Sequence, residues 1–275
     1  MEIGYWSDTG LVRSLNEDSV LCTRFDLKTH LGIVSAGLFA VADGMGGHNA
    51  GEVASDLAVR TFHAECLSHL LTQTTISPLS ILEAAAVRTN AIVFNTAAQE
   101  GLRGMGTTLT AALVIGNNLY VAHIGDSRCY IINTRETIQV TKDHSVVQQL
   151  VDAGIITAEE AMHHPNRNEI TRALGYFRET TPDLYHLKLY AGDHILLCSD
   201  GLCGVLPQEK IAQTVLRSPS ASQACLDLTA QANLAGGPDN ISVIIVKPEN
   251  LPSWQAVVSA ETTLAGKSGG NDVGL

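Results

Sequence analysis

One short stretch combines the parts of a cation site. Residues 39–51 read FAVADGMGGHNAG. The apolar run Phe39–Ala42 is typical of a buried strand, and it is followed by the carboxylate of Asp43 and a glycine-rich turn. Glycines let the backbone adopt positive φ and approach a bound group closely. A carboxylate beside peptide carbonyls that no side chain shields is suited to a hard cation.

Two other glycine motifs are excluded by spacing. A dinucleotide fingerprint that starts Gly44-x-Gly46 needs glycine at position 49, where this chain has Asn49. A P-loop needs Gly-Lys followed by Ser or Thr, and none follows here. On these residues alone, a plain strand-to-helix turn with an incidental aspartate remains an alternative.

The same arrangement recurs along the chain. The apolar run before Asp200 leads into Gly201, and Asp239 lies between a glycine-proline turn and another apolar run. Two more acids, Asp18 and Asp126, stand at comparable strand or turn junctions. Ligands that are all oxygen favour magnesium or manganese. Several carboxylates at one site can hold two such ions ~4 Å apart, the geometry used in phosphoester chemistry.

Arg13 lies in a polar loop that ends in two acids, Glu17 and Asp18. Its guanidinium could grip a phosphate through two parallel hydrogen bonds. A solvated loop arginine is the simpler alternative, and the local sequence does not decide between them.

Periodicity predicts an α+β chain rich in hairpins. Helical spacing begins at Ala50, and a second helix is expected from Ser77-Pro78, where a cap residue precedes proline. Two amphipathic stretches are expected at 207–216 and 220–234. The expected strands cover 3–7, 19–25, 107–115, 119–124, 128–133, 137–141, 184–190, 194–199 and 241–246. Those from 107 to 141 read as one meander, in which both faces of the first two strands are largely apolar.

Residues 143–172 are polar and contain a small helix opened by a capping box, Thr157 with Glu160. Such an inserted segment is typical of a flap beside a site, although a plain surface excursion fits equally well. Residues 248–275 show little periodicity, so we expect a flexible extension after a single domain over 1–247.

Composition narrows the class of protein. A length of 275 residues with 45% hydrophobic residues fits one large globular domain. The net charge of −11 argues against nucleic acid as the main partner. We expect no signal peptide and no membrane span. The six cysteines are scattered without C-x-x-C spacing, which predicts reduced thiols in a cytoplasmic protein.

The ordered motifs resemble the type 2C family of metal-dependent protein phosphatases, in its compact bacterial form. The matching pieces run from Ser7 to about Val246: SDTGLVRSLNEDS, VADGMGGHNAGEVAS, MGTTLTAAL, AHIGDSR, TKDHS, HPNRNEITRALG, LLCSDGL and GGPDNISVIIV. The resemblance implies a four-layer α-β-β-α sandwich of two mainly antiparallel sheets flanked by helices, with metals at one edge and residues 143–172 as the flap. Cys203-Gly204 departs from the family, because relatives often have an acid at the second of these two positions.

The resemblance also implies residue roles. Two or three Mg²⁺ or Mn²⁺ ions would be held by Asp18, Asp43, the Gly44 carbonyl, Asp126, Asp200 and Asp239, with Glu17 beside them through water. Arg13 would grip the phosphate, His48 would protonate the leaving oxygen, and His164 of the flap would help to handle substrate.

These roles imply a serine/threonine protein phosphatase that hydrolyses phosphoserine and phosphothreonine with a metal-activated water. Its partners would be phosphorylated proteins made by an opposing serine/threonine kinase, and a monomer is expected. A catalytically weak phosphoprotein-binding member and a small-molecule phosphoesterase are the alternatives.

Overall fold

The structure, a computed structural model, describes residues 1–29, 32–46, 50–72 and 77–254. These residues contain two antiparallel sheets. The first sheet has the order β1 (Glu2–Asp8), β11 (Ile241–Lys247), β10 (His194–Cys198), β7 (Arg128–Ile132), β8 (Thr137–Gln139). The second has the order β2 (Asp18–Thr29), β3 (Gly32–Met45), β5 (Leu109–Ile115), β6 (Asn118–Ile124), β9 (Asp183–Lys188), and short β4 (Gly106–Thr107) pairs with the end of β3.

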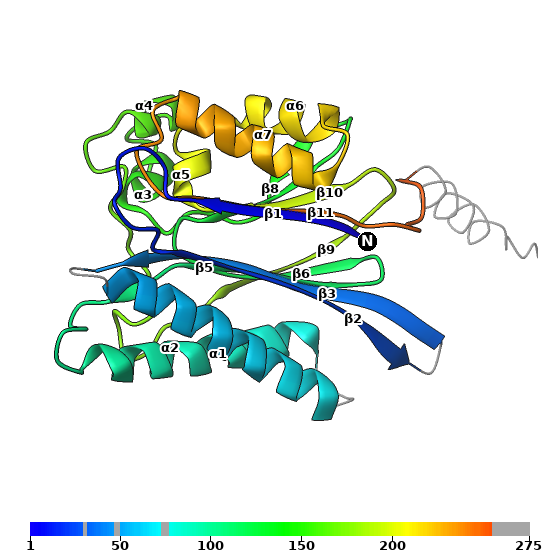
Figure 1. Ribbon diagram of the computed structural model, residues 1–275, viewed down its shortest axis with the longest axis horizontal. Coiled ribbons are helices and arrows are strands. Elements are labelled where there is room, and N and C mark those ends of the chain that lie inside the picture. Colours follow the sequence, from blue (N-terminus) through cyan, green and yellow to red (C-terminus); the bar gives the residue numbers. More distant parts are fainter. Residues whose placement is uncertain (30–31, 47–49, 73–76, 255–275) are drawn as a thin grey trace, which may run out of the picture.

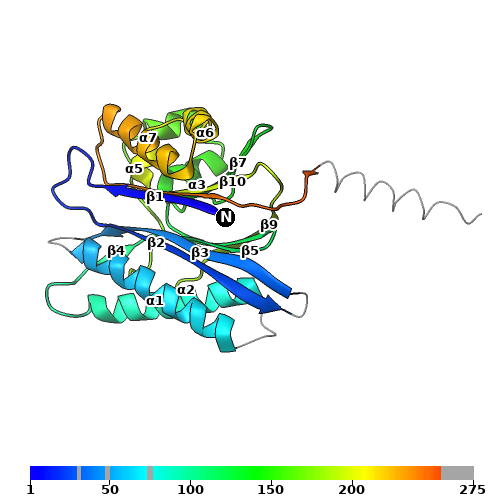
Figure 2. The same cartoon turned by 45° about the vertical axis from the view of Figure 1, so that its right-hand side comes forward.

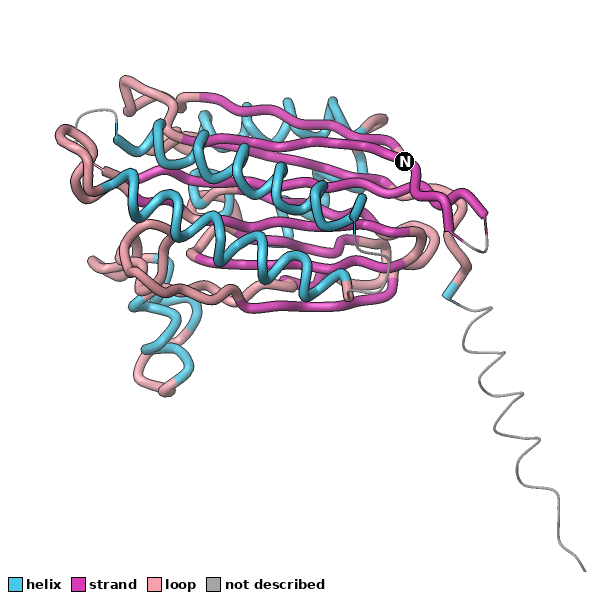
Figure 3. Tube along the Cα trace, turned by 90° about the horizontal axis from the view of Figure 1, so that it is seen from below, coloured by secondary structure: helices cyan, strands magenta, loops and turns pink. Residues whose placement is uncertain are grey.

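Helices cover the outer face of each sheet (Figures 1 and 2). Helices α1 (Ala50–Thr72) and α2 (Pro78–Ala97) lie side by side across the second sheet, as Figure 3 shows from that side. Helices α6 (Gln208–Arg217) and α7 (Ala221–Leu234) cover the first sheet. The predicted four-layer α-β-β-α sandwich is confirmed.

Strand alternation explains why the sheets are covered on both faces. Successive side chains of a strand point to opposite faces. Phe39 and Val41 of β3 therefore pack between the sheets, against Leu197 and Ile244 of the opposite sheet among others. Leu38 lies on the other face and packs in the cluster beneath α1 and α2. Alternate apolar residues of one strand thus stabilise two interfaces, one between the sheets and one with the helices. Each contributes ~25 cal/mol per Å² of buried apolar surface.

The predicted single meander is wrong at one point. The turn at 125–127 carries the chain from β6 in the second sheet to β7 in the first. Gly125 makes this crossing with φ +111°, and a Cβ atom there would lie 2.5 Å from Cγ2 of Thr108. Strands that are apolar on both faces fit either sheet, so their sequence pattern could not reveal the change.

The segment at 143–172 forms two short helices, α3 (Val146–Asp152) and α4 (Ala158–Met162). The predicted capping box at Thr157 and Glu160 is present. Helix α3 and the single turn α5 (Asp200–Cys203) were not anticipated, because each is too short to show periodicity.

The beginning of the predicted extension contacts the domain. Trp254 packs edge-on against Tyr190 with ring centroids 4.8 Å apart, and the Arg135 guanidinium lies 5.0 Å from the Trp254 ring centroid. Residues 255–275 and His48 lie outside the described residues. All six cysteines are free thiols. Within the described chain, no helix combines the length and apolar character that a membrane crossing requires.

Candidate metal centre

Two carboxylates face each other across the ladder of β2 and β3. Asp18 begins β2 and is paired in register with Asp43 near the end of β3. Thr108 fixes the backbone at Asp43, because its Oγ1 accepts from the Asp43 N–H and its own N–H donates to the Asp43 carbonyl, each at 2.9 Å. The strand pairing therefore brings together two acids that are distant in sequence.

The first sheet adds acids at the same end of the sandwich. Asp200 follows β10, and Asp239 precedes the neighbouring antiparallel strand β11, so both lie where those strands meet the loops (Figure 1). Ser199 joins the two sheets there: its Oγ donates to Oδ2 of Asp18 at 2.8 Å and accepts from the Ser242 N–H at 2.9 Å.

Asp126 completes the group from the crossing turn between the sheets. Its side chain is buried, and burial raises its pKa well above the usual range. Among neighbouring charges, Asp200 contributes most to that rise. Asp126 and Asp200 therefore lie within electrostatic reach of each other, and a shared third ion stays a prediction.

Burial and mutual repulsion act on the whole cluster. Burial, together with the charges of Asp200 and Asp239, raises the pKa of Asp18 to about 7. Burial also raises the pKa of Asp43, with Asp18 and Asp200 as the leading neighbours. The pKa of Asp200 is raised by burial and by Asp239, while a hydrogen bond with Asp43 opposes the shift. Carboxylates held this way are costly to keep charged.

Two carboxylate oxygens of the cluster are buried without a hydrogen-bond partner: Oδ1 of Asp18 and Oδ1 of Asp200. A buried unsatisfied polar atom costs about 1–3 kcal/mol, and more for a charged group. A bound ion is one of the recognised explanations for such atoms. The donor set, all oxygen, suits Mg²⁺ or Mn²⁺.

No three His, Cys, Asp or Glu side chains of the described chain meet tightly enough to form a ready cation site. The acids nevertheless raise one another's pKa, so they lie within electrostatic reach. Repulsion separates like charges, and a shared cation would favour their closing together.

Arg13 contacts the edge of the cluster. Its Nη2 donates to Oδ2 of Asp239 at 2.7 Å, and the arginine side chain is 49% exposed. The hydrogen bond to Asp239 is the main cause that raises the pKa of Arg13, and the charges of Glu17 and Asp43 add to it. The guanidinium therefore faces both the acids and solvent.

Close backbone packing explains the glycine at position 44. A Cβ atom there would lie 2.1 Å from the Gly51 carbonyl oxygen and 2.5 Å from that of Glu17. The Gly44 N–H also donates to the Glu17 carbonyl at 3.1 Å. The turn after Asp43 is thus packed against the residues that precede Asp18.

Two predicted residues remain, His48 and His164. His48 lies outside the described residues. His164 is half-buried, and its Nδ1 accepts from the Asn166 N–H at 3.1 Å within the flap. Among the residues with described placement, no hydrogen bond or ion pair links His164 to the five acids.

Sequence reasoning missed Asn240, which braces the site. Its Oδ1 accepts from the Glu17 N–H at 2.8 Å, and its Nδ2 donates to the carbonyls of Thr9 and Leu15 at 2.9 Å each. Asn240 is buried and directly follows Asp239. An Asp-Asn pair after a Gly-Gly-Pro turn could have signalled a side chain that holds another loop.

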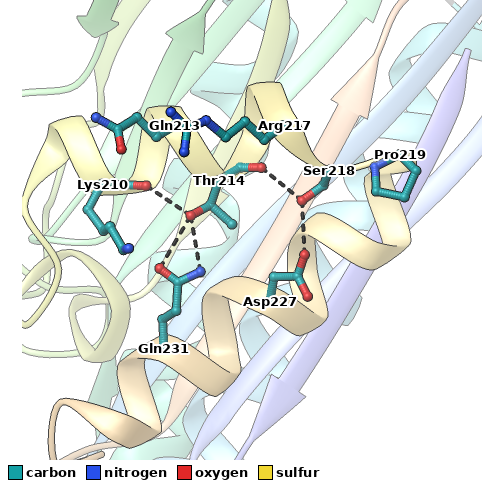
Figure 4. A pocket seen from close by; sticks show the side chains of 8 residues that line it. All are labelled: Lys210, Gln213, Thr214, Arg217, Ser218, Pro219, Asp227 and Gln231. Atoms are coloured by element: carbon teal, nitrogen blue, oxygen red, sulfur yellow. Dashed lines mark hydrogen bonds between the residues drawn. The ribbon is translucent and has the colours of Figure 1, made fainter.

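A hollow of about 260 Å³ lies elsewhere, between α6 and α7 (Figure 4). Lys210, Gln213 and Arg217 line it, and its four other polar side chains are hydrogen-bonded within it. Thr214 bonds to Gln231, and Ser218 donates to Asp227 at 3.1 Å. This hollow is a polar groove between helices and lacks the free carboxylate oxygens of the cluster.

Comparison with known proteins settles the family. The model of the family described as "Protein phosphatase 2C" matches residues 11–241. The chain belongs to the protein phosphatase 2C family. The matched region contains every acid of the cluster, together with Arg13.

Named relatives in this family are bacterial. The chain is 42% identical over 269 residues to the serine/threonine protein phosphatase PstP of Mycobacterium tuberculosis, covering 97% of this chain and 48% of that protein. It is 35% identical over 257 residues to the serine/threonine phosphatase stp of Listeria monocytogenes, covering 90% and 96%. The chain thus spans about half the length of the mycobacterial relative and nearly all of the listerial one.

A solved structure of the same family contains metal. The catalytic domain of PstP in complex with two manganese ions superposes with a TM-score of 0.74 at 40% sequence identity, covering 88% of this chain and 96% of that one.

Proposed function

We propose that this chain is a metal-dependent serine/threonine protein phosphatase. The observation that carries the proposal is the cluster of five carboxylates at one end of the sandwich, with two buried oxygens unsatisfied and an arginine at its edge. Membership of the protein phosphatase 2C family and the two manganese ions of the related PstP domain support it.

The residues present fit divalent cations. Asp43, Asp200 and Asp239, with the Gly44 carbonyl, would hold two Mg²⁺ or Mn²⁺ ions, and Asp18 and Glu17 would act through water. Asp126 and Asp200 would hold a third. When bound, such ions lower the pKa of a coordinated water and offset charge on phosphate oxygens.

The chain's own groups would supply the rest of the reaction. Arg13 is exposed enough to exchange part of its contact with Asp239 for the dianionic phosphoryl group, and would orient that group. His48 would donate a proton to the serine or threonine oxygen as it leaves, an effect worth roughly 10²–10⁴-fold. His164 would contact substrate from the flap at 143–172.

The substrates would be phosphoproteins made by serine/threonine kinases. The catalytic unit would span residues 1–247 and act as a monomer in the cytoplasm, where its free thiols would stay reduced. A catalytically weak phosphoprotein-binding member is disfavoured, because all five acids and Arg13 are present. The small-molecule phosphoesterase is also disfavoured, because the sequence contains no nucleotide-binding loop that would support it.

The test is hydrolysis of a phosphothreonine peptide and of nitrophenyl phosphate, with manganese and with chelator. Wild type should turn over both substrates only with the metal, and Asp43→Ala should lose both activities. Asp56→Ala, an exposed acid on α1, is the matched control and should keep them. Turnover that survives chelation and Asp43→Ala would overturn the proposal. A folded, manganese-bound wild type without turnover would favour the phosphoprotein-binding alternative.

A further inference from the structure

The loop between β1 and β2 presents two neighbouring aliphatic side chains to solvent. Leu11 is 68% exposed and Val12 is 71% exposed, and Arg13 follows them directly. Exposed aliphatic residues that occur singly are ordinary. This pair instead adjoins the guanidinium that contacts Asp239 at the edge of the carboxylate cluster.

Hydrogen bonds fix the backbone that carries the pair. The Leu11 N–H donates to the Gly237 carbonyl at 2.8 Å. On either side of the pair, the carbonyls of Thr9 and Leu15 accept from the two N–H groups of the buried Asn240 amide. The loop is therefore tied at three points to the turn that precedes β11.

Close packing at Gly10 adds a fourth restraint. Gly10 has φ +76°, and a Cβ atom there would lie 2.2 Å from the carbonyl oxygen of Asp239. A side chain would force the loop away from the turn that carries this acid. The loop is thus seated on the turn of Asp239, and Leu11 and Val12 are held outward from a restrained backbone.

We propose that Leu11 and Val12 bind an apolar side chain of the substrate, one or two residues from its phosphorylated residue. This inference rests on the proposed phosphatase function. A phosphoryl group on Arg13 would bring the flanking peptide over the pair, because an extended chain advances only ~3.3–3.6 Å per residue. A restrained apolar surface loses little conformational freedom on binding.

The negative charge around Arg13 favours an apolar substrate residue over an acidic one at this position. Glu17 and Asp239 lie close enough to raise the pKa of Arg13, and the whole chain has a net charge of −11. Acidic flanking residues would be repelled there. The substrate class is therefore a phosphopeptide with an aliphatic or aromatic neighbour beside the phosphoresidue.

The experiment compares two phosphothreonine peptides that differ only in whether leucine or serine flanks the phosphoresidue. Manganese-loaded wild type should prefer the leucine peptide about tenfold in kcat/KM, equivalent to about 1.4 kcal/mol. Leu11→Asn with Val12→Asn should reduce the ratio to near one. Val12→Thr, which keeps the side-chain shape, should reduce it partly and guards against a misfolded loop.

Ile33→Asn is the matched control, since Ile33 is an aliphatic residue 76% exposed on the same strand as Asp43, near its opposite end. It should keep the wild-type ratio.

Nitrophenyl phosphate, which has no flanking residue, separates the two proposals. Wild type inactive on every substrate would refute the phosphatase function. An active wild type with no preference, or variants that lose all substrates equally, would overturn the role of Leu11 and Val12 alone.

Discussion

Two groups of buried charge lie two residues apart at the crossing from β6 to β7, and only one of them is satisfied. Arg128 donates to both carboxylate oxygens of Asp143, with distances of 2.7–3.1 Å, and to the Tyr130 hydroxyl. The side-chain amide of Gln139 also donates to Oδ1 of Asp143. Every charge in this group has a partner within the chain.

The carboxylate cluster that begins at Asp126 has no such balance. Its acids raise one another's pKa, and two of their oxygens lack partners. Arg128 itself lowers the pKa of Asp126, but burial and Asp200 outweigh it. One charged group is thus paired within the chain, whereas the acids of the other repel one another and leave two oxygens without partners.

The largest expected effect comes from breaking the unsatisfied group. Asp43→Asn should reduce turnover of nitrophenyl phosphate with manganese by about 1,000-fold, because a neutral amide would hold weakly the divalent ions that offset charge on the phosphate oxygens. Steady-state kinetics checks this, and circular dichroism checks that the variant is folded. A loss below tenfold would contradict a central position for Asp43.

Breaking the satisfied group should affect stability more than chemistry. Asp143→Asn leaves Arg128, whose side chain is 28% exposed, without its counter-charge, so the free energy of unfolding should fall by about 1–3 kcal/mol. Urea denaturation measures it. Asp56→Asn is the matched control, since Asp56 pairs with Arg60 at the same 2.7 Å but on the surface. That change should cost under about 0.5 kcal/mol. Equal costs for both pairs would contradict the argument from burial.

When cations are chelated, Asp43→Asn should stabilise the protein, the opposite of the effect expected for Asp143→Asn. It removes a buried carboxylate that its neighbours repel, while the new amide can still donate to Asp200. We expect the free energy of unfolding to rise by about 1 kcal/mol, the lower end of the desolvation cost. The same denaturation experiment in chelator checks this, and destabilisation would show that the acid already has a satisfying partner.

A further expected effect is a pH dependence of stability at a histidine whose two ring nitrogens are both hydrogen-bonded. His123 is buried between Thr110 and the Lys142 carbonyl, and burial lowers its pKa to about 3, with His144 adding to the shift. The unfolded chain takes up a proton below about pH 6.5, but the folded ring does not. Stability should therefore fall as pH decreases from about 6.5, by about 1.4 kcal/mol per unit.

His123→Gln should lack this part of the slope between pH 6.5 and 5. His186→Gln, an exposed ring on β9, serves as the control. An unchanged slope in His123→Gln would mean that the folded ring is protonated over that range.

Local sequence patterns predicted most of the helices and strands, and the family resemblance supplied their four-layer arrangement. Helix starts such as Ser77-Pro78 and the hairpin at 116–118 depend on residues close in the chain. The partition of β6 and β7 between sheets was missed, since strands apolar on both faces fit either sheet. The acids were found through their repeated setting at strand ends.

The side chains that contact those acids and the neighbouring loops could not be predicted from local sequence patterns. The bonds of Ser199 to Asp18 and of Asn240 to the loop at 9–15 join residues far apart in sequence. The interaction of Arg13 with Asp239 is equally remote. Such contacts follow from strand register, which the one-dimensional pattern does not specify.

The central claim is that the five acids form a divalent-cation centre, and calorimetric titration with Mn²⁺ tests it most directly. Chelator-treated wild type should bind two or more ions per chain. Asp43→Asn, Asp200→Asn and Asp239→Asn should each lose at least one ion, while Asp143→Asn should bind as many as wild type. Absence of binding to wild type, or unchanged binding in all three acid variants, would contradict the account.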